Sequence, residues 1–319
     1  MTNLSPRGLR ALVAGAAIFA TPMAAQAEQF INILTGGTSG VYYPIGVALS
    51  KIYGEKIEGA RTQVQSTKAS VENLNLLQKG NGEFAIALGD SVKYAWEGNA
   101  DVGFAAPLDK LRGIAAAYPN YIQVAAMAES GITTIADFKG KAISVGAPKS
   151  GTELNARAIM GALSMSYDDL GKTEYLPFAE SVELMKNRQL DATLQSAGLG
   201  VASLKDLATS VPTTIVSIPA EVATSLGAPY ISATIPAGTY EGQTADVQTL
   251  AVGNFFVTHE GVDEETVYQM TKLLFENLPE LVAAHKAAGA ISLEGALTGM
   301  PVPLHAGAER YYREAGLIK

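Results

Sequence analysis

Short runs of hydroxyl side chains and glycines, one of them preceded by a lysine, each stand directly before a helical pattern. In the first run Gly36, Gly37 and Gly40 let the backbone turn sharply, and Thr38 and Ser39 offer hydroxyls. Three further runs of this kind are residues 66–70, 89–91 and 146–151, and residues 195–198 form another small polar loop. Hydroxyls together with the free N–H groups of a helix start suit an anion or another polar ligand. The runs are therefore candidate binding positions.

Each of these hydroxyls is also a candidate helix cap, and the two roles do not exclude each other. Ser150 and Glu153 have the spacing of a capping box, in which each side chain accepts from the other's backbone N–H. Lys149 places a cation just ahead of that helix start, which suits a carboxylate or phosphate; the alternative is a solvated surface lysine. Arg157 is expected to pair with Glu153 at i, i+4.

The residue types argue against an enzyme. The chain has no cysteine and only three histidines, His259, His285 and His305, which are widely spaced. A thiolate nucleophile, a disulfide and a zinc site are thereby disfavoured. No Gly-x-Ser-x-Gly elbow, Walker A motif or Gly-x-Gly-x-x-Gly pattern occurs, and no carboxylate pair typical of glycoside hydrolysis stands out. We expect no catalytic residues, no metal and no cofactor.

The elements that must position the polar runs alternate between strands and helices. Apolar or alternating strand patterns occur at 30–34, 61–65, 84–88, 111–117, 121–127, 141–145, 173–178, 191–195, 212–218, 230–235 and 250–258. Helical patterns occur after Pro44 and at 71–80, 92–98, 152–163, 181–190 and 266–285, with a short helix and turn at 132–138. This alternation predicts an α/β fold with largely parallel sheets, whose ligands bind beyond the carboxyl ends of the strands.

The N-terminus predicts export. Arg7 and Arg10 precede the apolar run 11–20, and Ala25-Gln26-Ala27 follows, so residues 1–27 have the form of a cleavable signal peptide. The apolar run is too short to span a bilayer, and no later one is longer, so we expect a periplasmic protein without membrane insertion. The net charge of −8 argues against nucleic acid as a partner.

Three segments together carry a family resemblance. They are GGTSGVYYPIGVALSKIY, VQSTKASVENLNLLQKGNGEFAIALGDSVKYAWEG and SGITTIADFKGKAISVGAPKSGTELNARAIM. The chain resembles the substrate-binding protein of a tripartite ATP-independent periplasmic (TRAP) transporter of the TAXI class, over almost the whole length after residue 27. It departs from the family at Gly89-Asp90-Ser91, where Gln-Ser-Asp is common, and at Lys149, where glycine is common.

The resemblance implies a type II periplasmic-binding fold, with two α/β lobes joined by crossing strands and a ligand cleft between the lobes. It places lobe 1 at 28–120 plus 252–319 and lobe 2 at 121–251. From the resemblance and the polar runs together, the candidate ligand-binding residues are Thr38, Ser39, Tyr42, Tyr43, Thr67, Ser70, Asp90, Ser91, Lys149, Ser150, Gly151, Thr152 and Gln195. Either tyrosine has core packing as its alternative role.

The function expected from this reading is delivery of a small carboxylate to the permease of a TRAP transporter, with fused membrane subunits. The expected ligand is a C5 dicarboxylate such as 2-oxoglutarate, or a glutamate-like acid, and the protein is expected to be a monomer. Two alternatives use the same cleft: an ABC-type receptor for an anion, and a ligand-sensing partner of a membrane histidine kinase.

Overall fold

The computed structural model describes residues 1–2 and 29–319, so the predicted signal peptide lies almost wholly outside the described residues. The strands are β1 (Gln29–Leu34), β2 (Ala60–Gln65), β3 (Phe84–Leu88), β4 (Leu111–Met127), β5 (Ala142–Ser144), β6 (Lys172–Glu174), β7 (Ala192–Ala197), β8 (Thr213–Val216), β9 (Ile231–Ile235) and β10 (Val247–His259). The helices are α1 (Tyr42–Lys56), α2 (Ser70–Gln78), α3 (Gly89–Glu97), α4 (Gly151–Ala162), α5 (Phe178–Lys186), α6 (Ala202–Ser210), α7 (Ala220–Leu226), α8 (Glu264–Glu276), α9 (Leu278–Ala284) and α10 (Ala306–Glu314). Short 3-10 helices are η1 (Ala100–Val102), η2 (Ala128–Ser130), η3 (Ile135–Phe138), η4 (Tyr167–Asp169) and η5 (Lys286–Ala290).

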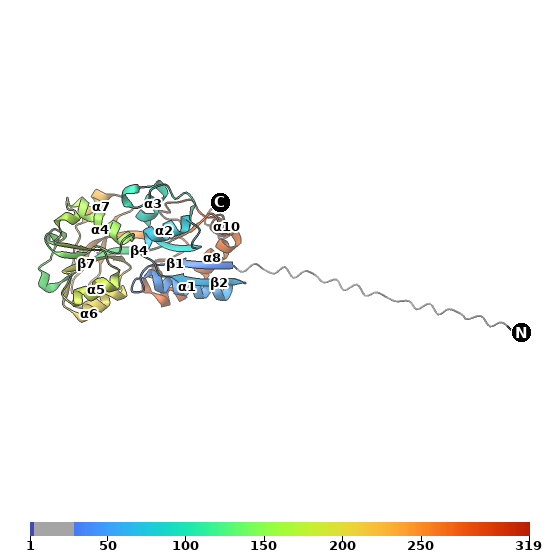
Figure 1. Cartoon of the computed structure of the whole chain (residues 1–319), viewed down its shortest axis with the longest axis horizontal. Coiled ribbons are helices and arrows are strands. Elements are labelled where there is room, and N and C mark those ends of the chain that lie inside the picture. Colours follow the sequence, from blue (N-terminus) through green and yellow to red (C-terminus); the bar gives the residue numbers. More distant parts are fainter. Residues whose placement is uncertain (3–28) are drawn as a thin grey trace.

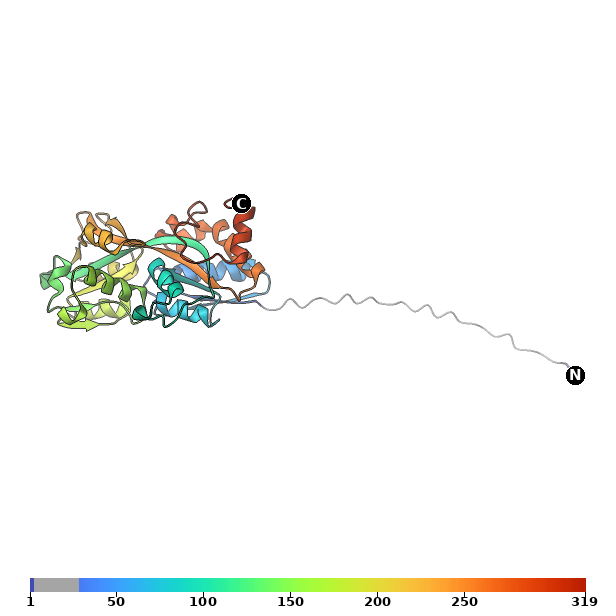
Figure 2. The same cartoon turned by 90° about the horizontal axis from the view of Figure 1, so that it is seen from above.

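Two groups of parallel strands flank a central antiparallel pair. The sheet runs in the order β2-β1-β3-β10-β4-β7-β5-β6, with β8 beside β4 and β9 beside β10. The strands β1, β2 and β3 are parallel to one another, as are β5, β6 and β7. The long strands β4 and β10 pair antiparallel along most of their length and connect the two groups, which Figure 2 shows from above.

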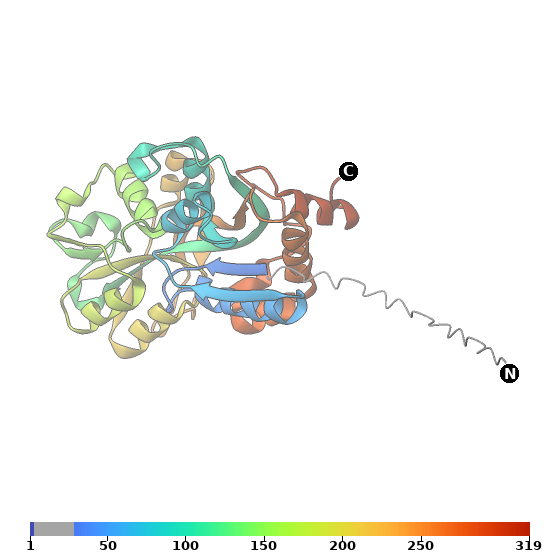
Figure 3. The same cartoon turned by 45° about the vertical axis from the view of Figure 1, so that its right-hand side comes forward.

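The predicted fold class is confirmed: two α/β lobes are joined by crossing strands. In Figure 1 the strands β1 and β2 lie with α1 and α8 at one end of the molecule, and β7 lies with α4, α5 and α6 at the other. Helix α10 packs on α8 at the outer end of the first group, away from the second (Figure 3). We propose lobe limits of 28–120 plus 252–319 and 121–251, which fall within β4 and β10.

Several elements differ from the sequence expectation: helices α6, α7 and α10 were not predicted, and two further differences involve prolines. The strands expected at 111–117 and 121–127 are one continuous strand, β4, which passes through Pro119. The ladder between β4 and β10 shifts its register close to this proline, between Gly253 and Phe255, and an irregularity of that kind tolerates a residue without an N–H. The helix expected at 266–285 is divided into α8 and α9, because Pro279 in the first turn of α9 cannot continue a helix.

The apolar patterns explain why the polar runs sit where the strands end. All five residues of β3 are buried, as expected for a strand covered on both faces. Ile45, Leu49 and Ile52 lie on one face of α1 and are fully buried, so this helix packs on the sheet and starts at its edge. Within the described part of the chain, no helix has the length and apolar character needed to cross a bilayer.

An exposed capping box at η3 gives a prediction about pH. The Asp137 carboxylate accepts backbone N–H bonds from Thr133 at 2.9 Å and Thr134 at 2.8 Å, which lowers its pKa to about 2. Because the pKa in the folded state is lowered, the stabilisation is present above the usual value of 3.8 and is lost as the pH falls towards 2. An NMR titration of Asp137 should give a midpoint near 2; a midpoint near 4 would contradict the box.

Candidate functional site

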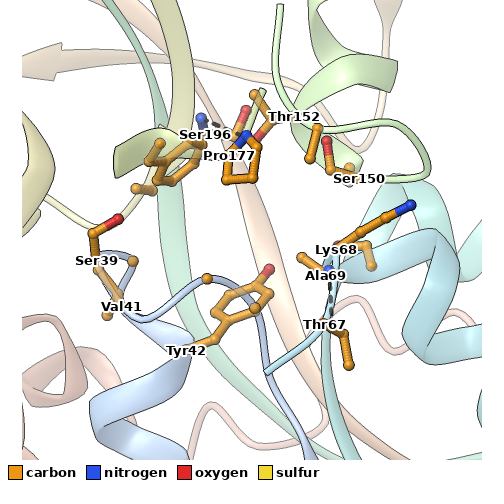
Figure 4. A pocket seen from close by; sticks show the side chains of 18 of the residues that line it. Ser39, Val41, Tyr42, Thr67, Lys68, Ala69, Ser150, Thr152, Pro177 and Ser196 are labelled. Carbon is orange, nitrogen blue, oxygen red and sulfur yellow. Dashed lines mark hydrogen bonds between the residues drawn. The ribbon is translucent and has the colours of Figure 1, made fainter. Parts of the chain in front are cut away.

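A cavity of about 310 Å³ lies between the two lobes, at the carboxyl ends of the parallel strands. Figure 4 shows Ser39, Val41 and Tyr42 on one side and Ser150, Thr152 and Ser196 on the other. The lining residues are Gly36, Gly37, Thr38, Ser39, Gly40, Val41, Tyr42, Ser66, Thr67, Lys68, Ala69, Ser70, Leu88, Asn120, Ala147, Ser150, Gly151, Thr152, Pro177, Phe178, Ala179, Glu180, Ser196 and Ala197. The cavity is thus walled by residues from both lobes, as the sequence led us to expect for a ligand cleft.

Four helices begin at this cavity. The first residues of α1, α2, α4 and α5 all line it, and so does Leu88, the residue that precedes α3. A helix start leaves N–H groups without intrahelical partners and carries a partial positive charge. Several helix starts around one cavity therefore create an environment that favours a negative group.

The caps of these helices differ in a way that matters for binding. Ser150 caps α4, because its hydroxyl accepts from the Glu153 N–H at 3.1 Å. The expected reciprocal half of this capping box is replaced by the i, i+4 pair: the Glu153 carboxylate binds Arg157 at 2.7 Å and accepts from the Tyr167 hydroxyl. The residues that precede α1, α2 and α5 make no side-chain cap, so the N–H groups there are not occupied by a capping side chain.

Tyr42 is held at the base of the cavity by a buried amide. Its hydroxyl donates to the Asn254 side-chain oxygen, and the Asn254 amide donates to the Tyr118 carbonyl at 2.7 Å and to Asn120 Oδ1 at 2.8 Å. Burial raises the pKa of the Tyr42 phenol well above its usual range, and bonding to Ser70 and Asn120 opposes part of this rise. Tyr42 is therefore a neutral phenol in a fixed position.

The bonding continues from Asn120 into the second lobe. The Asn120 amide donates to the Ser196 carbonyl at 2.9 Å, and the Ser196 hydroxyl donates to Asn155 Oδ1 at 2.5 Å. The Asn155 amide then donates to Asp90 Oδ2 at 2.7 Å. We call this set the polar belt; its members are Tyr42, Asn254, Asn120, Ser196, Asn155 and Asp90, and all are buried.

Asp90 ends the polar belt in the first turn of α3. Its Oδ2 also accepts from the Tyr230 hydroxyl at 2.7 Å, and its Oδ1 accepts from the Ser91 N–H at 2.6 Å. Burial raises the pKa of the Asp90 carboxyl, and the bonds donated by Tyr230, Ser91 and Asn155 oppose the rise. Asn155 and Tyr230 lie in the proposed second lobe, 121–251, so their hydrogen bonds to Asp90 connect the two lobes.

The structure gathers many of the predicted site residues around the cavity. Those that line it are Thr38, Ser39, Tyr42, Thr67, Ser70, Ser150, Gly151 and Thr152. Of these, the Thr67 hydroxyl lies 2.9 Å from the Thr35 carbonyl oxygen and 2.6 Å from Asn73 Oδ1 and donates its single proton between them. The Ser70 hydroxyl accepts from the Leu88 N–H at 3.1 Å. The hydroxyls of Thr67 and Ser70 thus shape the loop as well as facing the ligand space.

Five predicted residues do not line the cavity; they are Tyr43, Asp90, Ser91, Lys149 and Gln195. Tyr43 follows Tyr42 in α1, and successive helical residues face different directions. Asp90 and Ser91 belong to α3 rather than to a loop, and both are fully buried. Gln195 is in β7 rather than in a loop, where neighbouring residues point to opposite faces; its Oε1 accepts from Ser203.

Lys149 was the cation expected at the anion site, and it lies elsewhere. It is exposed and borders a shallow depression with Glu153 and Arg157 on the outer side of the α4 start. Its φ of 64° is in the left-handed region that favours glycine. The cation that does line the cavity is Lys68, which Figure 4 shows beside Ala69, and the lining also includes Glu180.

The candidate residues that the sequence analysis missed come mainly from three places. Asn120 lies in β4 between the two expected strands, 111–117 and 121–127, where the sequence predicts a connection. Ser196 follows Gln195 in β7, which extends to Ala197. Because side chains alternate along a strand, extending the expected strand to residue 197 would have placed Ser196 and Gln195 on opposite faces. Phe178 and Glu180 belong to the start of α5, which begins three residues before the helix expected at 181–190, while the strand expected at 173–178 ends earlier, as β6 at Glu174.

The two lobes and the cavity between them give the chain the fold of the periplasmic binding proteins. The chain belongs to the NMT1-like family, whose model matches residues 33–316. The resemblance to a TAXI-class TRAP receptor is therefore wrong, because the family model that matches the chain is the NMT1-like one.

Solved structures support the fold assignment at low sequence identity. Phosphonate-binding PhnD1 from Prochlorococcus marinus, solved in complex with methylphosphonate, is 10% identical with a TM-score of 0.59, over 91% of this chain and 100% of that one. The periplasmic binding protein BugD is 13% identical with a TM-score of 0.56, over 91% and 99%. A putative L-cystine ABC transporter protein from Listeria monocytogenes is 12% identical with a TM-score of 0.51, over 82% and 97%.

Proposed function

We propose that this protein is a periplasmic receptor that binds a small carboxylate and delivers it to an ABC-type permease. The observation that carries the proposal is the convergence of four helix starts on one hydroxyl-lined cavity of about 310 Å³. A cavity of that size suits a ligand of a few carbon atoms. The bound methylphosphonate of PhnD1 supports an anion, and the name of the Listeria relative supports an ABC system.

The charges around the cavity limit the net charge of the ligand. Lys68 and Glu180 line it, and each is exposed, so the charged side chains of the lining balance each other. The net positive potential in the cavity then comes from the helix starts, and each of them contributes less than the full charge of a lysine. This balance favours a ligand of low net charge, such as a glutamate-like acid, over a dianion such as 2-oxoglutarate.

A ligand screen with two lysine variants tests the proposal. Thermal shift and calorimetry on the mature protein would compare small carboxylates with methylphosphonate, a neutral sugar and an organic cation. A carboxylate at 100 times its Kd should stabilise the fold by about 2.7 kcal/mol. The proposal is wrong if only the sugar or the cation shifts the melting temperature.

The lysine variants locate the site. Replacing Lys68 by Ala should weaken carboxylate binding about fivefold, since it removes a partly screened charge of about 1 kcal/mol. Lys149→Ala is the matched control and should leave affinity unchanged, because Lys149 does not line the cavity. Equal losses in both variants would argue that the ligand binds elsewhere.

Uptake of the ligand by cells that lack the ATPase of the transporter should be lost; unchanged uptake would argue against an ABC system.

A further inference from the structure

The direction of the hydrogen bonds in the polar belt follows from backbone groups at its two ends and from the three donors that converge on the Asp90 carboxylate. The Ser91 N–H can only donate, so Asp90 Oδ1 is an acceptor, and the Asp90 carboxylate also receives Tyr230 and Asn155. An amide that donates its NH₂ to a carboxylate must present its oxygen on the other side. Asn155 Oδ1 therefore faces Ser196 and accepts its proton at 2.5 Å.

The Ser196 hydroxyl proton is donated to Asn155 and is therefore not available to a ligand. Ser196 lines the cavity, yet a hydroxyl has a single proton, and this one is donated away from the cavity to Asn155. The Ser196 oxygen can then offer only lone pairs to a ligand. Asp90 does not line the cavity; it acts through Asn155 and is a positioning residue.

At the other end of the polar belt, the Tyr42 hydroxyl likewise donates its proton to a buried amide. The Tyr118 carbonyl can only accept, and it receives the Asn254 amide at 2.7 Å. Asn254 Oδ1 must then accept the Tyr42 proton, which leaves the phenol oxygen as an acceptor only. Tyr42 and Ser196 border the same cavity from opposite lobes in Figure 4.

We propose that the cavity selects acids that carry a hydrogen-bond donor next to the acid group, and that an amino acid is the class that fits. This inference rests on the proposed function and narrows its ligand. The helix starts supply donors for the carboxylate, while Ser196, Tyr42 and the Glu180 carboxylate supply acceptors for an ammonium group. A keto acid of the same carbon skeleton has no donor there and leaves the buried Ser196 oxygen without a partner, whereas Glu180 is exposed to water and Tyr42 is also bonded by Ser70 and Asn120.

Calorimetry with matched acids tests the selectivity. Each set has one carbon skeleton with an α-amino, an α-hydroxy or an α-keto group, for example glutamate, 2-hydroxyglutarate and 2-oxoglutarate. We expect the amino acid to bind at least about tenfold more tightly than the keto acid, since unpaired buried acceptors are costly. Equal affinities would overturn the inference and leave the proposed function intact; no binding by any acid would overturn both.

Three variants separate positioning from folding. Ser196→Ala should reduce the amino-to-keto affinity ratio to within about threefold, because it removes the acceptor that distinguishes the two acids. Asp90→Asn should reduce the same ratio, because it frees the Asn155 amide to turn and release the Ser196 proton. Ser203→Ala, a buried serine outside the cavity, should leave the ratio unchanged. If the first two variants weaken all acids equally, the selectivity does not come from the polar belt.

Discussion

Replacing Gly151 by alanine is expected to weaken ligand binding by roughly 5- to 150-fold, the range for an overpacking cost of about 1–3 kcal/mol. Gly151 starts α4 and faces the first lobe. A Cβ atom there would lie 2.5 Å from Leu88 Cδ1 and 2.8 Å from Ser70 Oγ. Both neighbours belong to the opposite lobe and line the cavity, so the added methyl group acts as a wedge between the lobes.

The same helix supplies the control for this wedge. Gly161 is also in α4, and a Cβ there would meet no atom within 4 Å. Gly161→Ala should leave affinity unchanged and stabilise the helix by about 0.5–1 kcal/mol. Calorimetry gives the affinities, and small-angle scattering with and without ligand reports whether the lobes still close. An affinity of Gly151→Ala equal to that of Gly161→Ala would show that the lobes do not meet at α4 in the bound state.

The loops that form the cavity were the most predictable part of the molecule. Glycines, hydroxyls and the following helical patterns are local signals, and they placed Thr38, Ser39, Thr67, Ser70 and Ser150 correctly at the carboxyl ends of the strands. The α/β class was also accessible, because buried strands such as β3 are apolar throughout. The family was not, because glycines and hydroxyls between a strand and a helix are common in α/β proteins, and the matching family model is the NMT1-like one.

The polar belt could not be predicted from the sequence, because its hydrogen bonds join residues that are far apart in the chain. Asp90 meets Tyr230, which is 140 positions away, and Tyr42 meets Asn254, which is 212 positions away. No local pattern reports which buried amide will face which hydroxyl. Lys149 was expected at the cleft because it precedes α4, but it is exposed, has a left-handed backbone and borders the depression with Glu153 and Arg157 instead of the cavity.

The cleft offers a ligand both hydrogen-bond donors and hydrogen-bond acceptors, and the two have different origins. The donors come from backbone N–H groups at helix starts, which exist for any sequence that folds into these helices. The acceptors come from hydroxyls whose protons are drawn away by Asn155 and Asn254, and these depend on single side chains. A change of the buried amides behind the hydroxyls is therefore expected to change which ligand the cavity prefers without any change in the loops.

Replacing Asn254 by alanine is expected to lower the free energy of unfolding by about 3–5 kcal/mol. The side chain bonds three buried groups, namely the Tyr42 hydroxyl, the Tyr118 carbonyl and Asn120 Oδ1. Each buried polar group left without a partner costs about 1–3 kcal/mol, although repacking recovers part of the sum. Tyr42 would also lose its fixed orientation, so ligand affinity should fall as well.

Urea unfolding followed by circular dichroism measures this loss as a lower midpoint at an unchanged m value. Asn75→Ala is the matched control: Asn75 is half-buried in α2, and its amide bonds only the Val71 carbonyl one turn earlier, so its removal should cost less than about 1 kcal/mol. Tyr42→Phe should fall between the two, because it leaves Asn254 Oδ1 without a donor but keeps the ring and the other two bonds. If Asn254→Ala were no more destabilising than Asn75→Ala, water would be replacing the amide, and the belt would not hold the hydroxyls at the base of the cavity in fixed directions.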